Sequence, residues 1–396
     1  MLLLLLNVAH LFDHFFLLIF PTAVLVLGQA WGMSYGEALA LGTPAFAMFA
    51  LATLPVGWLG DRFSRVRLMT VFFFGIGAAS ILVGLSTGPL TLAASLGLLG
   101  LFAAIYHPVA TALVVQESRR AGAALGVNGV FGNLGVALAP VVTGALCAWL
   151  GWRAAFILPG LIALLSGVVF ALGPARAAAD APVIGSAAAT AAAPAAQVRV
   201  FAVVALGALF GGIVFNGMTV TLPKVFEERL AGLADGIGEV GLAASIVFGV
   251  ASLAQIPVGR LLDRVGARAV LLTCAGAQAL LLALMIQTGG PLVVALAVPL
   301  MLFVFGEIPV GAWLVGHYAA PGWRSRIYGV QYLLSLGVSA GVVPLIAVLH
   351  DRSGGFGLMF LLLAGAAGIV ALAALLLPRE SGQGRTALPQ TGIATR

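Results

Sequence analysis

The chain has 396 residues, of which 62% are hydrophobic and only 8% are charged, and its mean hydropathy is +1.15. Water-soluble domains carry about 25% charged residues, so this composition excludes a soluble enzyme, a nucleic-acid binder and a disordered protein. A single soluble core cannot absorb the apolar excess, because cores stop growing at about 250–300 residues. Lipid must therefore solvate the chain, and its net charge of +6 indicates a membrane surface and not nucleic acid.

Twelve apolar segments follow one another along the chain. A helix that crosses a bilayer needs about 20 mostly apolar residues. The segments are 2–27, 36–59, 67–87, 89–115, 121–150 and 153–173, and then 200–223, 236–262, 268–288, 290–318, 325–350 and 355–378. They are continuous, whereas the strands of a membrane β-barrel would alternate. We therefore expect an all-α membrane protein with twelve transmembrane helices in two pseudo-symmetric six-helix bundles.

Composition also predicts the domain boundaries. Residues 174–199 mix Ala, Pro, Gly and a few charges and lack the apolar length to cross a membrane. The segment after Pro378 is polar. We expect an N-terminal bundle over 1–173, a cytoplasmic linker over 174–199, a C-terminal bundle over 200–378 and a cytoplasmic tail over 379–396.

The basic residues predict the orientation of the spans. With the N-terminus inside, 15 of the 19 Lys and Arg residues fall in inner segments; the other four are Arg153, Lys224, Arg229 and Arg352. The positive-inside rule then places both termini in the cytoplasm. Met1 precedes five leucines without a positive segment or a small-residue cleavage site, so we expect it to open the first span. A multi-pass protein of a bacterial inner membrane is the expected class.

An internal repeat relates the two sets of spans. The sequence PVGWLGDRFSRVRL begins at Pro55, and PVGRLLDRVGARAV begins 202 residues later at Pro257. The same shift carries His14 onto Asn216. One register across several spans predicts two homologous halves related by an axis along the membrane normal.

The repeated loop predicts a gate on the cytoplasmic side. An Asp can pair there with an Arg or a helix N-terminus, and Gly lets neighbouring helices approach closely. Positive-inside charge alone would explain the arginines but not the repeated Asp and Gly. We assign this gate to Gly57, Asp61, Arg62, Arg65, Gly259, Asp263 and Arg264.

Two halves with a G-x-x-x-D-R-x-x-R-like loop, here from Gly57 to Arg65, resemble the major facilitator superfamily over essentially the whole chain. The glycine- and proline-bearing fifth span, GVFGNLGVALAPVVTGAL, looks like that of drug antiporters in this superfamily. The stretch IYHPVATALV and the polar first span are similar to the fosmidomycin-resistance-type efflux carriers. The chain departs from these carriers in placing Asp13 one residue before the usual acid. Its fourth span also lacks the membrane-embedded arginine of many proton-coupled drug exporters. The resemblance implies an alternating-access carrier, and the fifth span favours export.

The small residues of the fifth span have a structural interpretation. They form a seam for close helix packing, and a proline inside a helix kinks it. We expect packing and a kink, and not substrate binding, from Gly132, Gly135, Pro140 and Gly144.

Ionisable residues inside a bilayer are costly and therefore indicate functional sites. Asp13 and Glu307 are the acids that fall inside spans, and no Lys or Arg lies near the middle of one. His10, Asp13 and His14 share one helical face because of their spacing, and imidazoles can exchange protons near neutral pH. Glu307 precedes a proline whose kink favours a polar pocket. The predicted substrate or proton pathway comprises His10, Asp13, His14, His107, Asn216 and Glu307.

Two other interpretations of the first-span cluster stay open. Asp13 could fix a histidine tautomer within a packed bundle. Alternatively, two imidazoles and a carboxylate could hold Zn²⁺, with His107 as a third imidazole. Nothing in the sequence shows that these side chains converge, so we expect no metal and no cofactor.

The sequence thus predicts a monomeric secondary transporter that exports a small-molecule substrate, with export driven by protons. Its expected partners are the lipid bilayer, protons and this substrate. A proton symporter that imports a metabolite is one alternative, and a non-transporting receptor or scaffold is another. We expect no enzyme, because no nucleophile–base pair or nucleotide loop stands out, and no G-x-x-x-x-G-K-[ST] motif supports ATP-driven pumping. The lack of mid-span Lys or Arg favours a neutral, zwitterionic or cationic solute.

Overall fold

The computed structural model describes residues 1–118, 121–173, 194–319 and 321–378, and within these ranges all regular elements are helical. The side chains of Asp61 and of 121–123, 194–196 and 321–326 lie outside this description. Among the described residues, twelve helical segments are long and apolar enough to cross a membrane. The predicted all-α fold with twelve spans is therefore confirmed.

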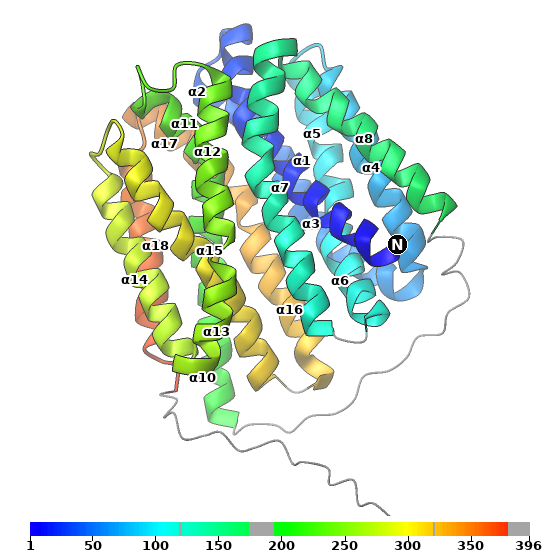
Figure 1. Cartoon of the computed structure of the whole chain (residues 1–396), viewed down its shortest axis with the longest axis vertical. Coiled ribbons are helices and arrows are strands. Elements are labelled where there is room, and N and C mark those ends of the chain that lie inside the picture. Colours follow the sequence, from blue (N-terminus) through cyan, green and yellow to red (C-terminus); the bar gives the residue numbers. More distant parts are fainter. Residues whose placement is uncertain (119–120, 174–193, 320, 379–396) are drawn as a thin grey trace, which may run out of the picture.

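The N-terminal half supplies six spans (Figure 1). Two of them are broken: α2 and α3 together form the second span, and α5 and α6 form the fourth. The helices are α1 Leu2–Trp31, α2 Tyr35–Ala40, α3 Thr43–Arg62, α4 Arg65–Gly84, α5 Pro89–Ala103, α6 Tyr106–Glu117, α7 Ala121–Leu150 and α8 Trp152–Leu172.

The C-terminal half supplies the other six spans, of which the seventh, eighth and eleventh are each built from consecutive helices. One turn of the seventh span is a π-helix, η1. The elements are α10 Pro194–Leu206, η1 Gly207–Gly211, α11 Gly212–Arg229, α12 Ile237–Ser252, α13 Gln255–Val265, α14 Ala267–Met285, α15 Leu292–Tyr318, α16 Pro321–Gly337, α17 Ser339–Ser353 and α18 Gly357–Ala374.

Helix α10 begins inside the segment that the sequence assigns to the linker. Its first residue is Pro194, and proline suits the first position of a helix because its missing N–H would have no partner there. Alanines, the best helix formers, follow at once. Residues 174–193 lie outside the described residues, so the remainder of the predicted linker is not described.

Local signals explain the turn between the first two spans. Gly32 ends α1 with a left-handed backbone, φ 64°, a conformation that glycine adopts without steric cost. Ser34 then starts α2 with a capping box: its hydroxyl accepts a hydrogen bond from the Glu37 N–H at 3.1 Å, and Glu37 accepts one from the Ser34 N–H at 2.9 Å. This turn lies at the upper end in Figure 1, where α2 is labelled.

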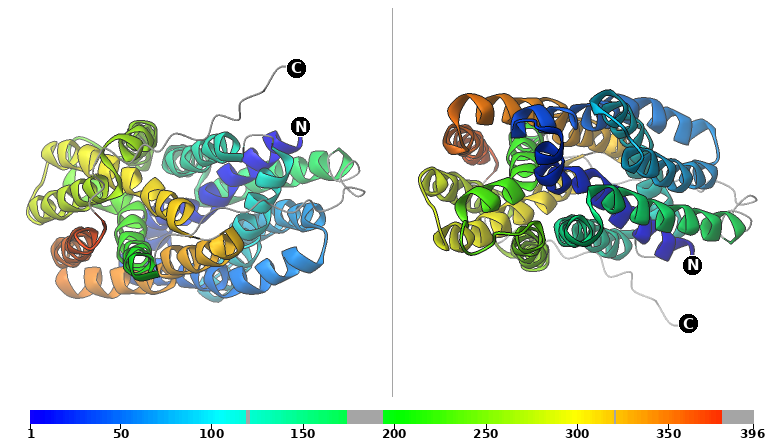
Figure 2. Two further views of the ribbon diagram at one scale, coloured as in Figure 1. Left: turned by 90° about the horizontal axis from the view of Figure 1, so that it is seen from below. Right: turned by 90° about the horizontal axis from the view of Figure 1, so that it is seen from above.

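The two halves lie side by side and meet along several helices (Figure 2). Helix α7 packs against α1 in its own half and against α12 in the other half. The α7–α12 contact is close because it is made by glycines: a Cβ on Gly144 would lie 2.6 Å from the Ile237 carbonyl oxygen. The backbone N–H of Val141 also donates to the Ser245 hydroxyl at 2.9 Å.

Large apolar side chains cover the outside of the bundle. Leu51, Leu161, Leu280 and Leu361 are each more than half exposed and lie on four different spans. Exposed apolar surface is unfavourable in water but not against lipid tails, which are equally apolar. The protein is a multi-pass integral membrane protein.

Candidate functional site

A small cavity lies between the two halves. Its walls come from α1, α3 and α6 on one side and from α11, α16 and α17 on the other. The polar residues that line it are Asp13, His14, His107, Asn216, Thr219 and Ser339. The cavity measures about 30 Å³, and one water needs about 10–15 Å³ of such space. It has room for waters but not for an organic solute, so the structure shows this site closed.

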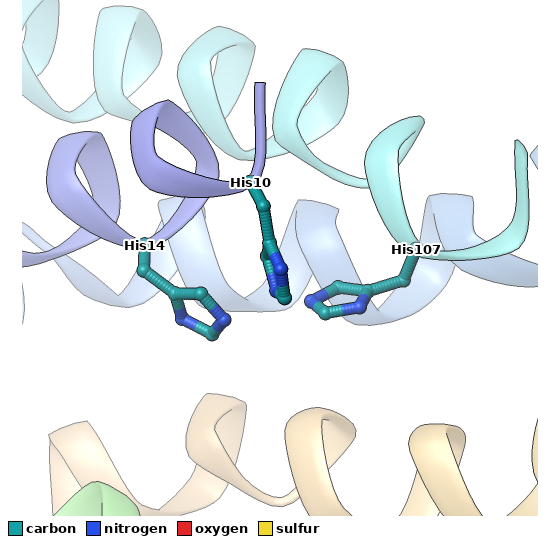
Figure 3. Close-up of side chains that lie close together, drawn as sticks. All are labelled: His10, His14 and His107. Carbon is teal, nitrogen blue, oxygen red and sulfur yellow. The ribbon is translucent and has the colours of Figure 1, made fainter. Parts of the chain in front are cut away.

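Three imidazoles point toward one another beside the cavity (Figure 3). His10 and His14 come from successive turns of α1, and His107 comes from the first turn of α6. The ring centroids are 5.0 Å apart for His10 and His14, 5.4 Å for His10 and His107, and 5.6 Å for His14 and His107. One nitrogen of each ring lies within 4.8 Å of those of the other two.

The His10 ring is held in a defined orientation. Its Nδ1 lies 2.7 Å from the backbone oxygen of Asn128; since a carbonyl can only accept, Nδ1 carries the proton and Nε2 keeps a free lone pair. Tyr106 stacks on the ring with centroids 4.7 Å apart. Gly132 of α7 leaves room for the nitrogen, because a Cβ there would lie 2.6 Å from Nε2.

A network of buried hydrogen bonds lies next to the His10 ring. The Asn128 amide donates to the Tyr106 hydroxyl at 2.8 Å and to Asn7 Oδ1 at 2.9 Å. The Tyr106 hydroxyl donates in turn to the Leu6 carbonyl at 3.3 Å. Because buried polar groups cost free energy unless they are paired, this network fixes α1, α6 and α7 relative to one another.

Asp13 is fully buried next to His107. Its Oδ2 lies 3.2 Å from His107 Nε2, yet neither carboxylate oxygen has hydrogen-bond geometry to any described residue. The His107 ring stacks on Tyr332 of α16, with centroids 5.3 Å apart. Buried polar groups without partners are rare in folded proteins, so this carboxylate is a candidate for binding a ligand.

Asn216 faces the same cavity from the other half. Its amide donates to the carbonyls of Gly212 at 2.8 Å and Ser335 at 3.0 Å, which leaves its oxygen as an acceptor. The repeat pairs Asn216 with His14, and both residues line the cavity. The structure therefore brings five of the six predicted pathway residues together.

Glu307 is the exception, because it belongs neither to the lining of this cavity nor to the histidine cluster beside it. It lies on α15, where its Oε2 accepts a hydrogen bond from Gln278 of α14 at 2.8 Å. Its Oε1 faces the π-helix η1, and a Cβ on Gly211 would lie 2.5 Å from that oxygen. Among the described residues, no cationic side chain forms an ion pair with Glu307.

The predicted gate is seen in part. The Asp61 side chain lies outside the described residues, so the expected Asp–Arg pairing in the first copy is not described. The Arg62 guanidinium sits 4.1 Å above the Trp58 ring, and Arg65 donates to the Gly60 carbonyl at 3.1 Å. The first contact holds Arg62 at the end of α3, and the second connects Arg65, the first residue of α4, to the end of α3.

The second copy of the loop contacts a different helix. Asp263 accepts a hydrogen bond from the Trp313 indole N–H at 3.3 Å, which connects α13 to α15, while Arg264 is exposed. The close helix approach expected at the repeated glycines is not seen in this structure. A Cβ on Gly57 would meet Pro108 at an ordinary 3.7 Å, and no atom lies within 4 Å of a Cβ on Gly259.

The glycines of the fifth span do lie at close contacts. A Cβ on Gly132 would meet His10, one on Gly135 would overlap the Leu11 carbonyl, and one on Gly144 would meet the partner half. Pro140 lies inside α7, next to the Val141 N–H that bonds across the interface. Gly132, Gly135 and Gly144 therefore lie at close packing contacts, and Gly132 also shapes the histidine cluster.

Sequence reasoning missed the neutral polar partners of these groups. Asn7 and Asn128 support His10, and Gln278 supports Glu307. The available signal was the same as for the acids: an amide side chain inside an otherwise apolar span needs a partner. Tyr332, which stacks on His107, carries no such signal because tyrosine is common in apolar spans.

A membrane bundle of two six-helix halves, with ionisable groups around a closed cavity between them, has the architecture of a solute carrier. The sequence profile of the Major Facilitator Superfamily matches residues 3–237 and 230–395. The chain belongs to this superfamily. These findings support transport and not catalysis, in agreement with the sequence.

Several curated relatives share part of the sequence. A probable 4-methylmuconolactone transporter of Cupriavidus pinatubonensis is 32% identical over 161 residues, which cover 38% of this chain and 38% of the relative. Puromycin resistance protein pur8 of Streptomyces alboniger is 35% identical over 113 residues, covering 28% and 22%. A probable actinorhodin transporter of Streptomyces coelicolor is 34% identical over 137 residues, covering 33% and 24%. The chain thus spans well under half the length of each of these relatives.

Solved structures share the fold over nearly the whole chain. A bacterial homolog of the human lysosomal transporter Spinster, in its inward-facing and unoccupied conformation, aligns with a TM-score of 0.69 and 16% identity, covering 95% of this chain and 94% of that one. Its occupied inward-facing conformation gives a TM-score of 0.70 and 17% identity, covering 95% and 93%. At this identity the likeness shows the fold alone.

Proposed function

We propose that the protein is a secondary transporter that exports a small solute across a bacterial inner membrane in exchange for protons, with both termini in the cytoplasm. Membership of the superfamily and the closed cavity between two halves support alternating access. A relative named for puromycin resistance favours export, because removal of a toxic compound protects a cell.

We assign the solute path to the cavity and the histidine cluster beside it. His14, Asp13 and His107 face Asn216 across the interface between the halves. Among the described residues, the cavity lining contains no Lys or Arg, which supports a neutral, zwitterionic or cationic solute. Since the cavity is closed, the halves must separate on one side to admit the solute.

The observation that carries the proton assignment is the environment of Glu307. An ionised carboxylate inside a membrane is expensive unless it is paired, and Glu307 has a neutral amide partner, Gln278. Cys274 of α14 lies close to this part of α15, because a Cβ on Gly306, the residue before Glu307, would lie 3.7 Å from the Cys274 Sγ. A carboxyl group in such surroundings can take up a proton in one state and release it where its site is wetted.

The first test removes the proton site but keeps its shape. In proteoliposomes, Glu307→Gln should abolish solute accumulation driven by a pH gradient, while exchange of labelled for unlabelled solute continues. The amide can still hydrogen-bond to Gln278 but cannot release a proton. If the variant still concentrates the solute against its gradient, Glu307 does not couple transport to protons.

A matched pair of glycine variants tests the same site without changing the acid. Gly211→Ala places a methyl group 2.5 Å from the Glu307 oxygen and must displace it, whereas a Cβ on Gly207, in the same π-helix, meets no atom within 4 Å. We expect reduced proton-driven transport in Gly211→Ala and near-normal transport in Gly207→Ala. Equal rates in the two variants would show that the position of Glu307 is unimportant.

A further inference from the structure

We propose that His10, His14 and His107 bind a divalent transition-metal ion of the Zn²⁺ class beside the cavity between the halves. This metal site would lie on the solute path proposed above. Only its role in transport rests on that proposed function. Binding of the ion itself follows from the side chains.

The spacing of the three rings suits one ion. Two imidazoles one turn apart on α1 and a third from α6 place their nitrogens within 4.8 Å of one another. Around a tetrahedral Zn²⁺, with Zn–N of about 2.1 Å, ligand nitrogens lie about 3.4 Å apart. Each ring therefore needs to move by less than about 1 Å, which small side-chain rotations provide.

The surroundings orient the rings as ligands. Metal-bound histidines usually donate their second ring N–H to a carbonyl or carboxylate, and His10 Nδ1 does so to the Asn128 carbonyl at 2.7 Å. Gly132 leaves space at the free Nε2. Tyr106 and Tyr332 stack on the rings of His10 and His107, which limits their motion before an ion arrives.

The charge balance also favours a cation. Asp13 is fully buried, its Oδ2 is 3.2 Å from His107 Nε2, and neither oxygen is hydrogen-bonded to a described residue. A divalent ion would pair this carboxylate, which can serve as a fourth ligand. Imidazole donors favour zinc and its neighbours over magnesium and calcium, which prefer oxygen.

This inference revises the expectation of no metal drawn from the sequence. Spacing along α1 could not show that His107 reaches the same point, because that depends on how α6 packs. The structure shows this convergence, and it places the buried Asp13 carboxylate beside His107.

The experiment measures ion binding by the full-length protein in detergent, after treatment with a chelator. Titration calorimetry with Zn²⁺ should show one ion per chain, and Co²⁺ in its place should give the visible absorption of a four-coordinate site with nitrogen ligands. His14→Ala and His107→Ala should each weaken binding at least 100-fold. Asp13→Asn should weaken it at least about 10-fold, because the amide lacks the charge that the carboxylate offers as a fourth ligand.

His317→Ala is the matched control, because His317 is exposed and stacks on Trp313 away from the cluster. It should bind Zn²⁺ like the wild type. The proposal is wrong if the wild type binds no stoichiometric Zn²⁺, or if the triple alanine variant at His10, His14 and His107 binds it equally well. The absence of Zn²⁺ binding by the wild type already contradicts the proposal, so that outcome does not depend on whether the variants fold. No solute is moved in this assay, so a negative result leaves the transport proposal standing.

Discussion

Two glycines of helix α7 differ in the space around them, and this difference gives them different roles. A Cβ on Gly135 would overlap the Leu11 carbonyl of α1, whereas a Cβ on Gly126 meets no atom within 4 Å. Both lie in the same helix and in the same kind of sequence. Only the first is required for the packing of α1, which carries His10 and His14.

This difference predicts a measurable contrast in stability. Gly135→Ala should lower the free energy of unfolding by about 1–3 kcal/mol, the usual cost of overpacking, because the opposing atom belongs to the backbone and cannot rotate away. Gly126→Ala should leave stability unchanged or raise it by up to about 1 kcal/mol, since alanine favours the helix. Thermal unfolding of both variants in one detergent compares them. Equal transition temperatures would contradict the close contact seen here.

The sequence predicted that three residues of the first span share one helical face. It did not predict which residues of other helices hold them in place. The helical spacing of His10, Asp13 and His14 gave their shared face, and the repeat gave Asn216 on the opposite wall. The hydrogen bond from His10 to Asn128 joins residues 118 positions apart. Such a pairing depends on the rotation of α7 about its axis, which single-sequence periodicity does not define.

At the scale of whole elements, helix α2 connects the halves at the end of the bundle far from the basic loops. The Ser34 hydroxyl donates to Asp351 Oδ2 at 2.6 Å, and the Gly36 N–H donates to Asp351 Oδ1 at 2.9 Å. The ring of Tyr35 also packs edge-on to His350 of α17, with centroids 4.8 Å apart. In an alternating-access cycle these contacts must break when that end opens.

Removal of this carboxylate should therefore favour the state open at that end. Charge-assisted hydrogen bonds contribute more than neutral ones, and a loss of about 1.4 kcal/mol changes a population ratio about tenfold. Asp351→Ala should shift the distance distribution between spin labels at Thr87 and Arg352 toward longer values. The labels require replacement of Cys147 and Cys274, the buried thiols.

Asp235→Ala is the control for this experiment. Asp235 is exposed and accepts a hydrogen bond from Gly232 of its own loop, so its removal should leave the distances unchanged. An identical distribution in the Asp351 variant and the wild type would mean that the contact does not hold the two halves together.

Span boundaries followed closely from hydropathy, while breaks within spans did not. The fifth span, predicted over 121–150, matches α7, and most others differ by a few residues. The break between α5 and α6 and the π-helix η1 leave the residues apolar, so hydropathy cannot reveal them. Both breaks matter for the site, because one positions His107 and the other faces Glu307.

For the whole molecule, the structure separates groups that the sequence combined into one pathway. The histidine cluster belongs to the N-terminal half and faces the cavity, whereas Glu307 lies among α14, α15 and η1 of the C-terminal half. Under the proposed function, solute and proton would thus bind at different places. Their coupling would then depend on the movement of the halves and not on direct contact.

Transport by the wild-type protein in proteoliposomes, with an imposed pH gradient, tests the central claim most directly. A mixture of small neutral, zwitterionic and cationic solutes is offered, and the solutes retained inside are identified by mass spectrometry. We expect at least one solute to accumulate in vesicles that are acidic inside, as antiport requires, and to leak out when a protonophore removes the gradient. Accumulation only in vesicles that are alkaline inside would indicate symport, and the absence of gradient-dependent movement of any solute would contradict proton-driven transport.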